Sequence, residues 1–231
     1  VFDGLAHSRV VEASITVDQV DSDSVPVIYA DKRPGENRFM SDLRRRAIMP
    51  GQVDELPVYV TAPAVVAYGS AQVSVPVGIS CVGFRVPADA PSRFVVELRT
   101  PDGGVLDRIE YEIEENDGVR LAWINVYGQI DYWNFAVRRK SSTKIAKEKI
   151  YTESGYIPTS MQMDTTETII TRPLPEVQTD VLCQVFVAED VWLIGDGEVR
   201  PVDITSESVT TYEAEKLSSI QVEYRNKIRE L

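Results

Sequence analysis

The stretch Leu121–Phe135, LAWINVYGQIDYWNF, holds two of the three tryptophans and two of the ten tyrosines of this 231-residue chain. One set of alternating positions holds Leu121, Trp123, Asn125 and Tyr127. Gly128-Gln129 interrupts this alternation, and Ile130–Phe135 returns to residue types that are common in β-strands. Glycine between two such runs marks a turn, because it adopts backbone conformations that other residues avoid. The stretch therefore predicts two β-strands that are joined by a tight bend and carry two of the three tryptophans.

Within this stretch, Trp123 to Phe135 follow the pattern W-[IL]-N-x-Y-G-x-x-D-Y-W-x-F. In this pattern the chain resembles uncharacterised β-rich proteins of gut Bacteroidetes and of their phages and prophages. The resemblance extends through an expected helix and a VWL strand to the C-terminus, about the second half of the chain. It implies a component of a phage tail or virion and places the protein in the virion; without a phage origin, the cell surface or secretion is the alternative. The pattern is an aromatic packing signature, so it implies no catalytic residue.

The chain is acidic, with a formal net charge of −12 and an isoelectric point near 4.6. Binding to a phosphate backbone needs a basic surface, so nucleic acid is not an expected partner. The cluster Arg44-Arg45-Arg46 is a local exception, where we expect an exposed strand or bend, with an anion or partner contact as the alternative. No run of about eighteen apolar residues occurs, so a membrane is not an expected partner either.

Residues 1–117 are predicted to form an antiparallel β-sandwich, because short β-type runs alternate there with turn residues. The runs are Val10–Val20, Val25–Ala30, Leu56–Thr61, Ala71–Ile79 and Phe94–Arg99. The sandwich is expected to be immunoglobulin-like in architecture only, because the Cys-Trp-Cys signature of immunoglobulin domains is missing.

Two of these runs allow finer predictions. In Ala71–Ile79, alternation of Val73, Val75 and Val77 predicts one half-buried strand, and Pro76 predicts that it lies at a sheet edge. The segment VELRTPDGGVLDRIEYEIEE predicts a hairpin with its turn at Pro101–Gly104. On its return strand, isoleucine and tyrosine alternate with glutamate, which predicts one buried and one solvated face.

Residues 118–231 are predicted to form a second, β-rich α+β domain, with the boundary in the charged turn Glu115–Gly118. One helix is expected at about residues 174–188, opened by Pro173 and Pro175 and packed on a sheet. Its apolar stripe consists of Val177, Val181, Leu182, Val185 and Phe186. A C-terminal hairpin follows, Val191–Ile194 and Val199–Ile204 around a Gly-Asp-Gly-Glu turn, and Ile220, Val222 and Tyr224 predict a closing strand.

Histidine and cysteine are sparse, whereas carboxylates are plentiful. His7 is the single histidine and lies near the chain end, where we expect it to be solvated. Cys81 and Cys183 are expected to be buried free thiols, with one interdomain disulfide as the alternative. The carboxylates Asp18, Asp21 and Asp23 lack the glycine and the final glutamate of an EF-hand, leaving a loop calcium site as a minor alternative. No cofactor or metal is therefore expected.

The candidate site is the aromatic stretch, as an interface or ligand platform made of Trp123, Tyr127, Asp131, Tyr132 and Trp133. Three interpretations stay open. The aromatic rings pack in the core or between the domains while Asp131 caps the Gly128 bend, or they form a protein interface, or they form a sugar-binding platform with an adjacent carboxylate. Sugar stacking would require exposed rings.

The function expected from these observations is that of a non-enzymatic structural or assembly protein of a phage tail or virion. Its partners would be proteins, either copies of itself or neighbouring virion proteins, and a small-molecule ligand is not expected. The alternative is a surface module that binds a carbohydrate or a host protein. A carboxylate-dependent hydrolase is the third hypothesis, and it would need two carboxylates about 5–10 Å apart in a cleft.

Overall fold

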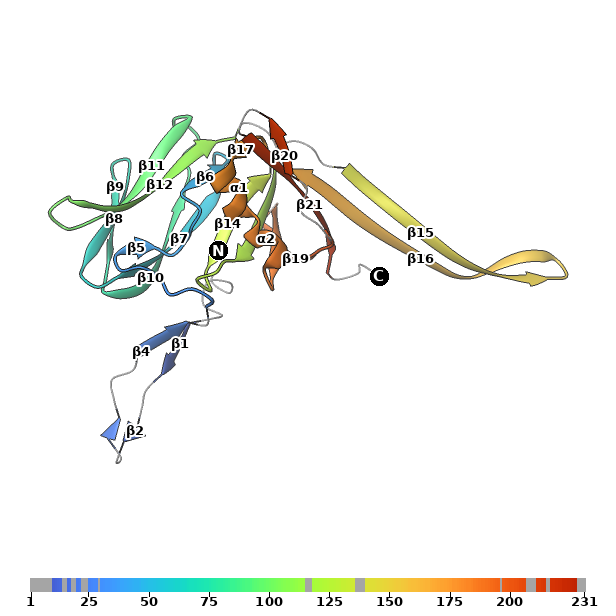
Figure 1. Ribbon diagram of the computed structural model, residues 1–231, viewed down its shortest axis with the longest axis horizontal. Helices are drawn as coiled ribbons and strands as arrows, with labels where there is room; N and C mark the ends of the chain where they lie inside the picture. Colours follow the sequence, from blue (N-terminus) through green and yellow to red (C-terminus); the bar gives the residue numbers. More distant parts are fainter. Residues whose placement is uncertain are drawn as a thin grey trace.

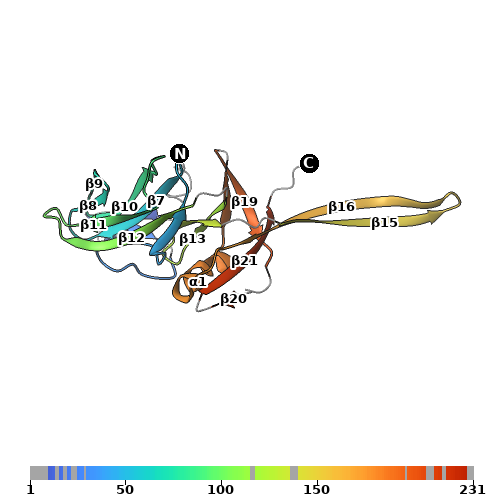
Figure 2. The ribbon, with the colours of Figure 1, turned by 90° about the horizontal axis from the view of Figure 1, so that it is seen from above.

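The computed structural model describes residues 10–13, 16–17, 20–21, 25–28, 30–114, 118–135, 140–195, 197–206, 211–214 and 217–227. These residues form a mostly β structure with several antiparallel sheets and short helices. Figure 1 shows a body of packed sheets from which a long two-stranded arm extends to one side, and Figure 2 shows the same arm from above. The predicted β-rich class is therefore confirmed.

The first half of the body is a two-layer sandwich. One sheet has the order β10 (Gly78–Arg85), β7 (Val53–Val60), β5 (Arg38–Phe39). The other has the order β6 (Arg45–Ile48), β12 (Val105–Ile113), β11 (Arg93–Arg99), β8 (Ala64–Tyr68), β9 (Ala71–Val75). Apolar side chains from both sheets, such as Val58 and Val96, form one buried cluster. Every pairing is antiparallel except that of β6 with β12, which is parallel.

The predicted hairpin of β11 and β12 is confirmed, with Ile109 and Tyr111 buried on the inner face. The prediction of one strand over Ala71–Ile79 is wrong, because the chain breaks at Pro76 and turns at Gly78, whose φ is +109°. Proline cannot donate to a strand ladder, so β9 ends before it. Val75 is buried while Val73 and Val77 are 46% and 60% exposed, and β9 does lie at the sheet edge, as predicted.

The N-terminal segment forms two small strand pairs. β1 (Val10–Ala13) pairs with β4 (Val25–Ile28), and β2 (Thr16–Val17) pairs with β3 (Val20–Asp21). The predicted run Val10–Val20 is thus divided among three short strands. Figure 1 shows the pair β1 and β4 projecting away from the body.

The second half is built on a large antiparallel sheet. Its main order is β14 (Ile130–Phe135), β13 (Val119–Ile124), β18 (Val191–Gly195), β19 (Glu198–Ile204), β21 (Leu217–Asn226), β16 (Gly155–Ile170), β15 (Lys140–Thr152). The short strands β17 (Leu174–Pro175) and β20 (Thr211–Ala214) pair with β21. The predicted hairpin of β18 and β19 and the closing strand β21 are confirmed, and the alternate residues Ile220, Val222 and Tyr224 are buried.

The predicted helix is present as two short pieces, α1 (Glu176–Leu182) and α2 (Gln184–Val187), which meet at Cys183. Leu182 and Val185 are buried in the core of the second half, as the stripe predicts. Val177 is an exception, because its side chain is 78% exposed. Val177 lies in the first turn of α1, where Pro175 and Glu176 are exposed as well, whereas Leu182 and Val185 flank the break at Cys183.

The two halves share part of their packing. The core of the second half is made mainly of residues from β13, β14, β18, β21 and the helices, but it also includes Leu43 and Ala47 from the first half. Of the predicted boundary turn Glu115–Gly118, residues 115–117 lie outside the described residues.

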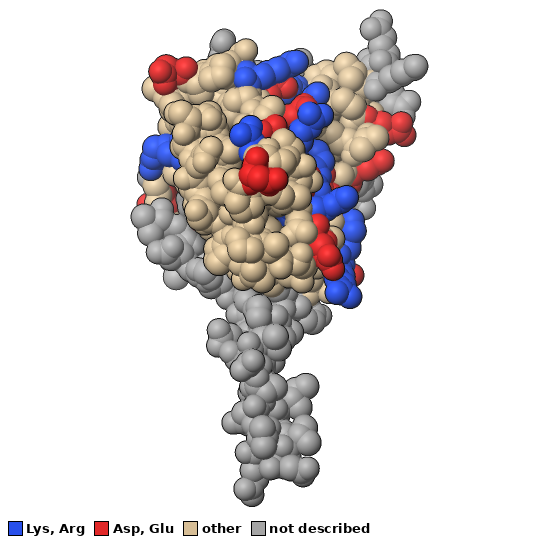
Figure 3. Space-filling view, turned by 90° about the vertical axis from the view of Figure 1, so that its left-hand side faces the viewer, with Lys and Arg blue, Asp and Glu red and all other residues tan. Residues whose placement is uncertain are grey.

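Charged side chains are unevenly distributed over the surface of the body. Figure 3 shows the end of the body opposite the arm, where uncharged residues cover the middle of the face and Lys and Arg side chains gather along one side.

Both cysteines are free thiols, but the prediction that both are buried is wrong for Cys81, which is exposed on β10. Cys183 is half-buried and packs against the core. A cysteine on a strand between apolar neighbours can face either side of a sheet, because side chains alternate.

Candidate functional site

The aromatic stretch forms the predicted hairpin, in which β13 pairs with β14 and Leu121 lies opposite Trp133. Its five candidate residues are all buried, with exposed fractions of 0% for Trp123, 6% for Tyr127, 0% for Asp131, 1% for Tyr132 and 1% for Trp133. Trp123 and Trp133 belong to the core of the second half, whereas Tyr132 belongs to a smaller cluster that also contains Ala122 and Ile130. Buried rings cannot stack on a sugar, so this stretch offers no open ligand platform.

The bend between the two strands is held by Asn125. Its side-chain oxygen accepts hydrogen bonds from the backbone N–H groups of Tyr127 (2.9 Å) and Gln129 (3.1 Å), and Gly128 has a φ of +69°. The expectation that Asp131 caps this bend is therefore wrong. Asparagine fulfils the role because its short side chain reaches the backbone two residues further on.

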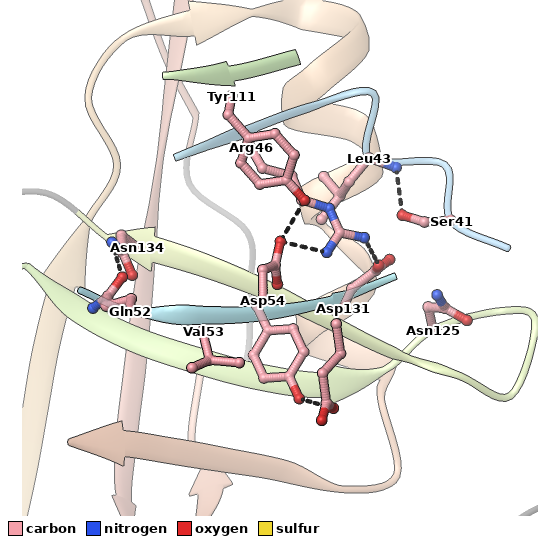
Figure 4. A network of polar contacts seen from close by, with 12 residues as sticks. Ser41, Leu43, Arg46, Gln52, Val53, Asp54, Tyr111, Asn125, Asp131 and Asn134 are labelled. Carbon is pink, nitrogen blue, oxygen red and sulfur yellow. Dashed lines mark hydrogen bonds and ion pairs between the residues drawn. The ribbon is translucent and has the colours of Figure 1, made fainter. Parts of the chain in front are cut away.

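Asp131 instead takes part in a buried network of polar side chains, which we call the seam (Figure 4). Its carboxylate lies 2.6 Å from Nη2 of Arg46 on β6, and Nη1 of Arg46 lies 3.1 Å from the carboxylate of Asp54 on β7. The hydroxyl of Tyr111 donates to the same oxygen of Asp54 at 2.6 Å. Arg120 on β13 completes the seam, 3.2 Å from the other oxygen of Asp54.

The seam joins the two halves of the chain. Arg46 and Asp54 belong to strands of the first half, whereas Arg120 and Asp131 belong to the aromatic hairpin. Arg120 also donates to the backbone oxygen of Val53 at 3.0 Å, and its guanidinium lies over the ring of Tyr132 at 4.8 Å. Two guanidinium groups and two carboxylates thus meet without net charge, at side-chain exposures of 3% or less.

The pKa shifts in the seam follow from burial and charge pairing. Burial lowers the pKa of an arginine, yet the negative charges of Asp54 and Asp131 raise the pKa of Arg46 above its ordinary value. Burial raises the pKa of Asp131, and the positive charge of Arg46 opposes this rise. Burial and the nearby Asp54 raise the pKa of Tyr111 well above 10. Each charged group of the seam meets an opposite charge, so the seam favours a particular packing of the strands.

The expectation of an exposed basic cluster at Arg44–Arg46 is wrong for Arg46, whose side chain is only 1% exposed. Arg44 and Arg45 do reach the surface, with exposures of 40% and 41%, and pair with Asp107 and Glu110. Arg46 points away from its strand neighbour Arg45 because side chains alternate between the two faces of a sheet, whereas Arg44 lies just before β6.

The single histidine and most of the alternative calcium loop lie outside the described residues. His7, Asp18 and Asp23 fall outside the described residues, and Asp21 lies in the short strand β3. Within the ranges that are described, no group of three or more His, Cys, Asp or Glu side chains could hold a metal ion. The helices among those residues are too short to cross a membrane.

The second notable region is the arm, residues 140–170, which consists of β15 and β16. Only Glu167–Ile170 at its base pair with β21, so residues 140–166 extend from the body as a two-stranded ribbon (Figures 1 and 2). The ribbon turns at Gly155, which has a φ of +104°. No element was predicted for this part of the sequence. A usable signal was present, because Ser154-Gly155 is a turn dipeptide flanked by Tyr151 and Tyr156.

Most side chains of the arm are exposed, including large apolar ones. Their exposed fractions range from 47% to 75%, and they are Ile145, Ile150, Tyr151, Tyr156, Ile157, Met161 and Met163. The rings of Tyr151 and Tyr156 meet near the tip, edge to face, with centroids 5.2 Å apart. Apolar side chains gathered on a surface in this way are typical of an interaction site.

Comparisons with known proteins provide no further constraint on the site. No protein-family model, curated protein or solved structure shows significant similarity to this chain.

Proposed function

We propose that this chain is a non-enzymatic structural protein that makes protein–protein contacts in a larger assembly, such as a phage tail or virion. The observation that carries the proposal is the arm, whose ribbon exposes a series of large apolar side chains. A two-stranded ribbon on its own is only marginally stable in water. A long ribbon that projects from a well-packed body therefore gains most of its order from a partner that covers it.

The body supports this proposal as a rigid base for the arm. The seam and the core of the second half fix β13, β14 and β21, and β21 carries the base of the arm through the pairing of Glu167–Ile170. We further propose that the two-layer sandwich of the first half is immunoglobulin-like in architecture. Such sandwiches serve many functions, so this likeness alone does not indicate one.

A second candidate function, a surface module that binds a carbohydrate or a host protein, is favoured by one observation. Tyr151 and Tyr156 at the tip of the arm are 75% and 73% exposed, and exposed rings can stack on a sugar. Binding of the chain to a panel of glycans would distinguish the two functions. If the chain is a carbohydrate-binding module, replacement of both tyrosines by alanine should abolish this binding.

The assembly function can be tested by sedimentation of particles from the source cells. A shortened variant in which Asn-Gly joins Ser142 directly to Thr166 removes the outer arm and keeps a hairpin turn. We expect the intact chain to co-sediment with large particles and the shortened chain to stay in the light fractions. Equal sedimentation of both chains as small free proteins would overturn the proposal.

A further inference from the structure

We propose that the partner of the arm is a second copy of this chain, and that one face of the arm docks in a groove beside α1 of that copy. This inference rests on the proposed assembly function and specifies its partner and its contact surface. Four observations support it: the two-sided pattern of the arm, its area, its charge and the groove.

The two faces of the arm differ in composition. Cross-strand partners share a face, and the pairs Ile145–Met163, Lys147–Met161, Lys149–Pro158 and Tyr151–Tyr156 all lie on one face. We call this the apolar face. On the opposite face the pairs Lys144–Asp164, Ala146–Gln162 and Glu148–Ser160 are mostly polar, and the apolar pair Ile150–Ile157 follows them near the tip. An arm with one apolar face is suited to lie flat on a surface rather than to remain in solvent.

The area of this face favours a partner that both receives an arm and supplies one. The twelve residues of β16 from Gly155 to Thr166 lie beyond the pairing with β21. At about 3.3 Å per residue and about 10 Å of ribbon width, the face covers about 400 Å². A stable interface needs about 800 Å² on each partner. A chain that donates one arm and accepts another reaches this area, as in a ring or a pair of copies with exchanged arms.

The charge of the arm permits this contact. Residues 140–170 contain four lysines and four acidic residues, so the arm is neutral and the rest of the chain carries the whole formal charge of −12. Two bodies of this charge repel each other at close range. The arm can approach a second body without that repulsion, and its apolar face carries only the positive charges of Lys147 and Lys149 between Thr143 and Tyr151.

The groove that we assign as acceptor measures about 490 Å³ and lies between α1 and the segment that leads into β6. Leu43, Pro175, Val177 and Val181 provide its apolar lining, and Val177 is 78% exposed. Charged residues at its rim pair with each other, with 2.7 Å between Arg44 and Asp107 and 3.4 Å between Arg45 and Glu110. These rim charges therefore keep their opposite charges when a ribbon covers the groove.

The first test is light scattering behind a sizing column with the purified full chain over a wide concentration range. We expect a discrete oligomer that Met163→Asp converts to monomer, because the substitution places a charge in the apolar contact. The matched control is Gln162→Asp, which adds the same charge to the adjacent residue on the opposite face, and this variant should still assemble. An oligomer that tolerates Met163→Asp would overturn the inference.

The acceptor groove has its own matched pair of variants. Val177→Asp should raise the dissociation constant of the oligomer at least tenfold, a loss of about 1.4 kcal/mol. Val187→Asp, on α2 and 81% exposed, should leave it unchanged, because Val187 lies outside this groove. Assembly that is sensitive to Met163→Asp but not to Val177→Asp would overturn the groove as the docking site.

A direct test traps the contact covalently between two differently labelled copies. In a Cys81→Ser background, which removes the exposed thiol, Met163→Cys on one copy and Val177→Cys on the other should form a mixed disulfide under mild oxidation. The pair Gln162→Cys and Val177→Cys should not. A monomer at all concentrations and no mixed disulfide would overturn docking on a second copy. The arm-dependent sedimentation described above would then still decide the proposed function by itself, because a different protein could cover the arm.

Discussion

The seam and the arm break the usual distribution of residues in opposite ways. In the seam, Arg46, Asp54, Arg120 and Asp131 are charged and buried, whereas the arm exposes apolar side chains such as Met163 to solvent. Charged residues are rarely buried unless they are paired, and large exposed apolar patches usually mark an interface. Each charge of the seam meets an opposite charge within the same chain. The apolar face of the arm finds no such complement in its own chain among the described residues, so a partner is needed to explain it.

The comparison also separates stability from assembly. Changes in the seam should alter the free energy of unfolding of the body, because they leave a buried charge without a counter-charge. Changes at the apolar face of the arm should alter association and leave the body unaffected.

The largest effect is expected for Arg46→Met, which leaves two carboxylates, those of Asp54 and Asp131, without their shared partner. Removal of one member of a buried ion pair typically costs about 3–5 kcal/mol, and we expect the upper end of this range. Urea denaturation followed by tryptophan fluorescence would measure the loss. The neighbouring Arg45→Met is the control, because Arg45 is 41% exposed and such surface pairs contribute about 1 kcal/mol or less. Equal losses for both variants would contradict the structural role of the seam.

A somewhat smaller effect is expected for Trp133→Ala in the aromatic hairpin. Trp133 is 1% exposed, and the cavity left by a large buried ring costs about 3–5 kcal/mol. Tyr151→Ala provides the contrast, because that ring is 75% exposed on the arm and its loss should change stability by less than about 0.5 kcal/mol. Thermal melts of the two variants suffice. A Trp133→Ala variant that melts like the wild type would refute the assignment of this ring to the core.

Local sequence patterns predicted the parts of the fold that depend on neighbouring residues. The hairpins of β11 with β12, β13 with β14 and β18 with β19 each combine alternating side chains with a turn residue such as Gly128 or Gly103, and all three are present. The seam was not predictable in this way, because Arg46 and Asp131 are separated by 85 residues. Only the packing of the two halves brings them together.

The arm escaped prediction for a different physical reason. A strand in a sheet shows a buried apolar side and a solvated polar side, but nearly all residues of β15 are exposed, so burial does not enforce alternation there. Lys147 and Lys149 stand on the same face as Ile145, which hides the pattern along one strand. The pattern becomes visible only when β15 is aligned with its partner β16.

A modest, pH-dependent effect is expected for Glu112→Gln at a second contact between the halves. Glu112 on β12 accepts a hydrogen bond of 2.7 Å from Arg172, which follows β16. Burial raises the pKa of Glu112, but the positive charges of Arg172 and Arg93 outweigh this and bring the pKa below its usual value. The ionised form is therefore favoured by folding, so its contribution is present above the unfolded pKa of about 4.3 and is lost as the pH falls through the lower folded pKa.

At pH 7 we expect the loss for Glu112→Gln to be about 1 kcal/mol or less, because both partners are partly exposed. The difference between the variant and the wild type should shrink as the pH is lowered below the ordinary glutamate pKa and should then vanish. Urea titrations at several pH values would measure it. A difference that grew on acidification would show that Glu112 is stabilised in its neutral form instead.

The smallest effect on the body is expected from the shortened arm in which Asn-Gly joins Ser142 to Thr166. The deleted residues pair only with each other, whereas the base of the arm, Glu167–Ile170, keeps its pairing with β21. Ile169, the buried residue of that base, stays in the core. Because the deleted ribbon contributes little to that core, the unfolding free energy of the body monomer should change by less than about 0.5 kcal/mol.

Measured at a protein concentration low enough to keep both chains monomeric, equal stability of the intact and shortened chains would separate the arm from the body. At high concentration the intact chain should gain stability that the shortened chain lacks, because binding to the folded state raises apparent stability by mass action. A shortened chain that unfolds more easily even as a monomer would mean that the arm packs on its own body. In that case the contrast between a self-sufficient seam and a partner-dependent arm would fail.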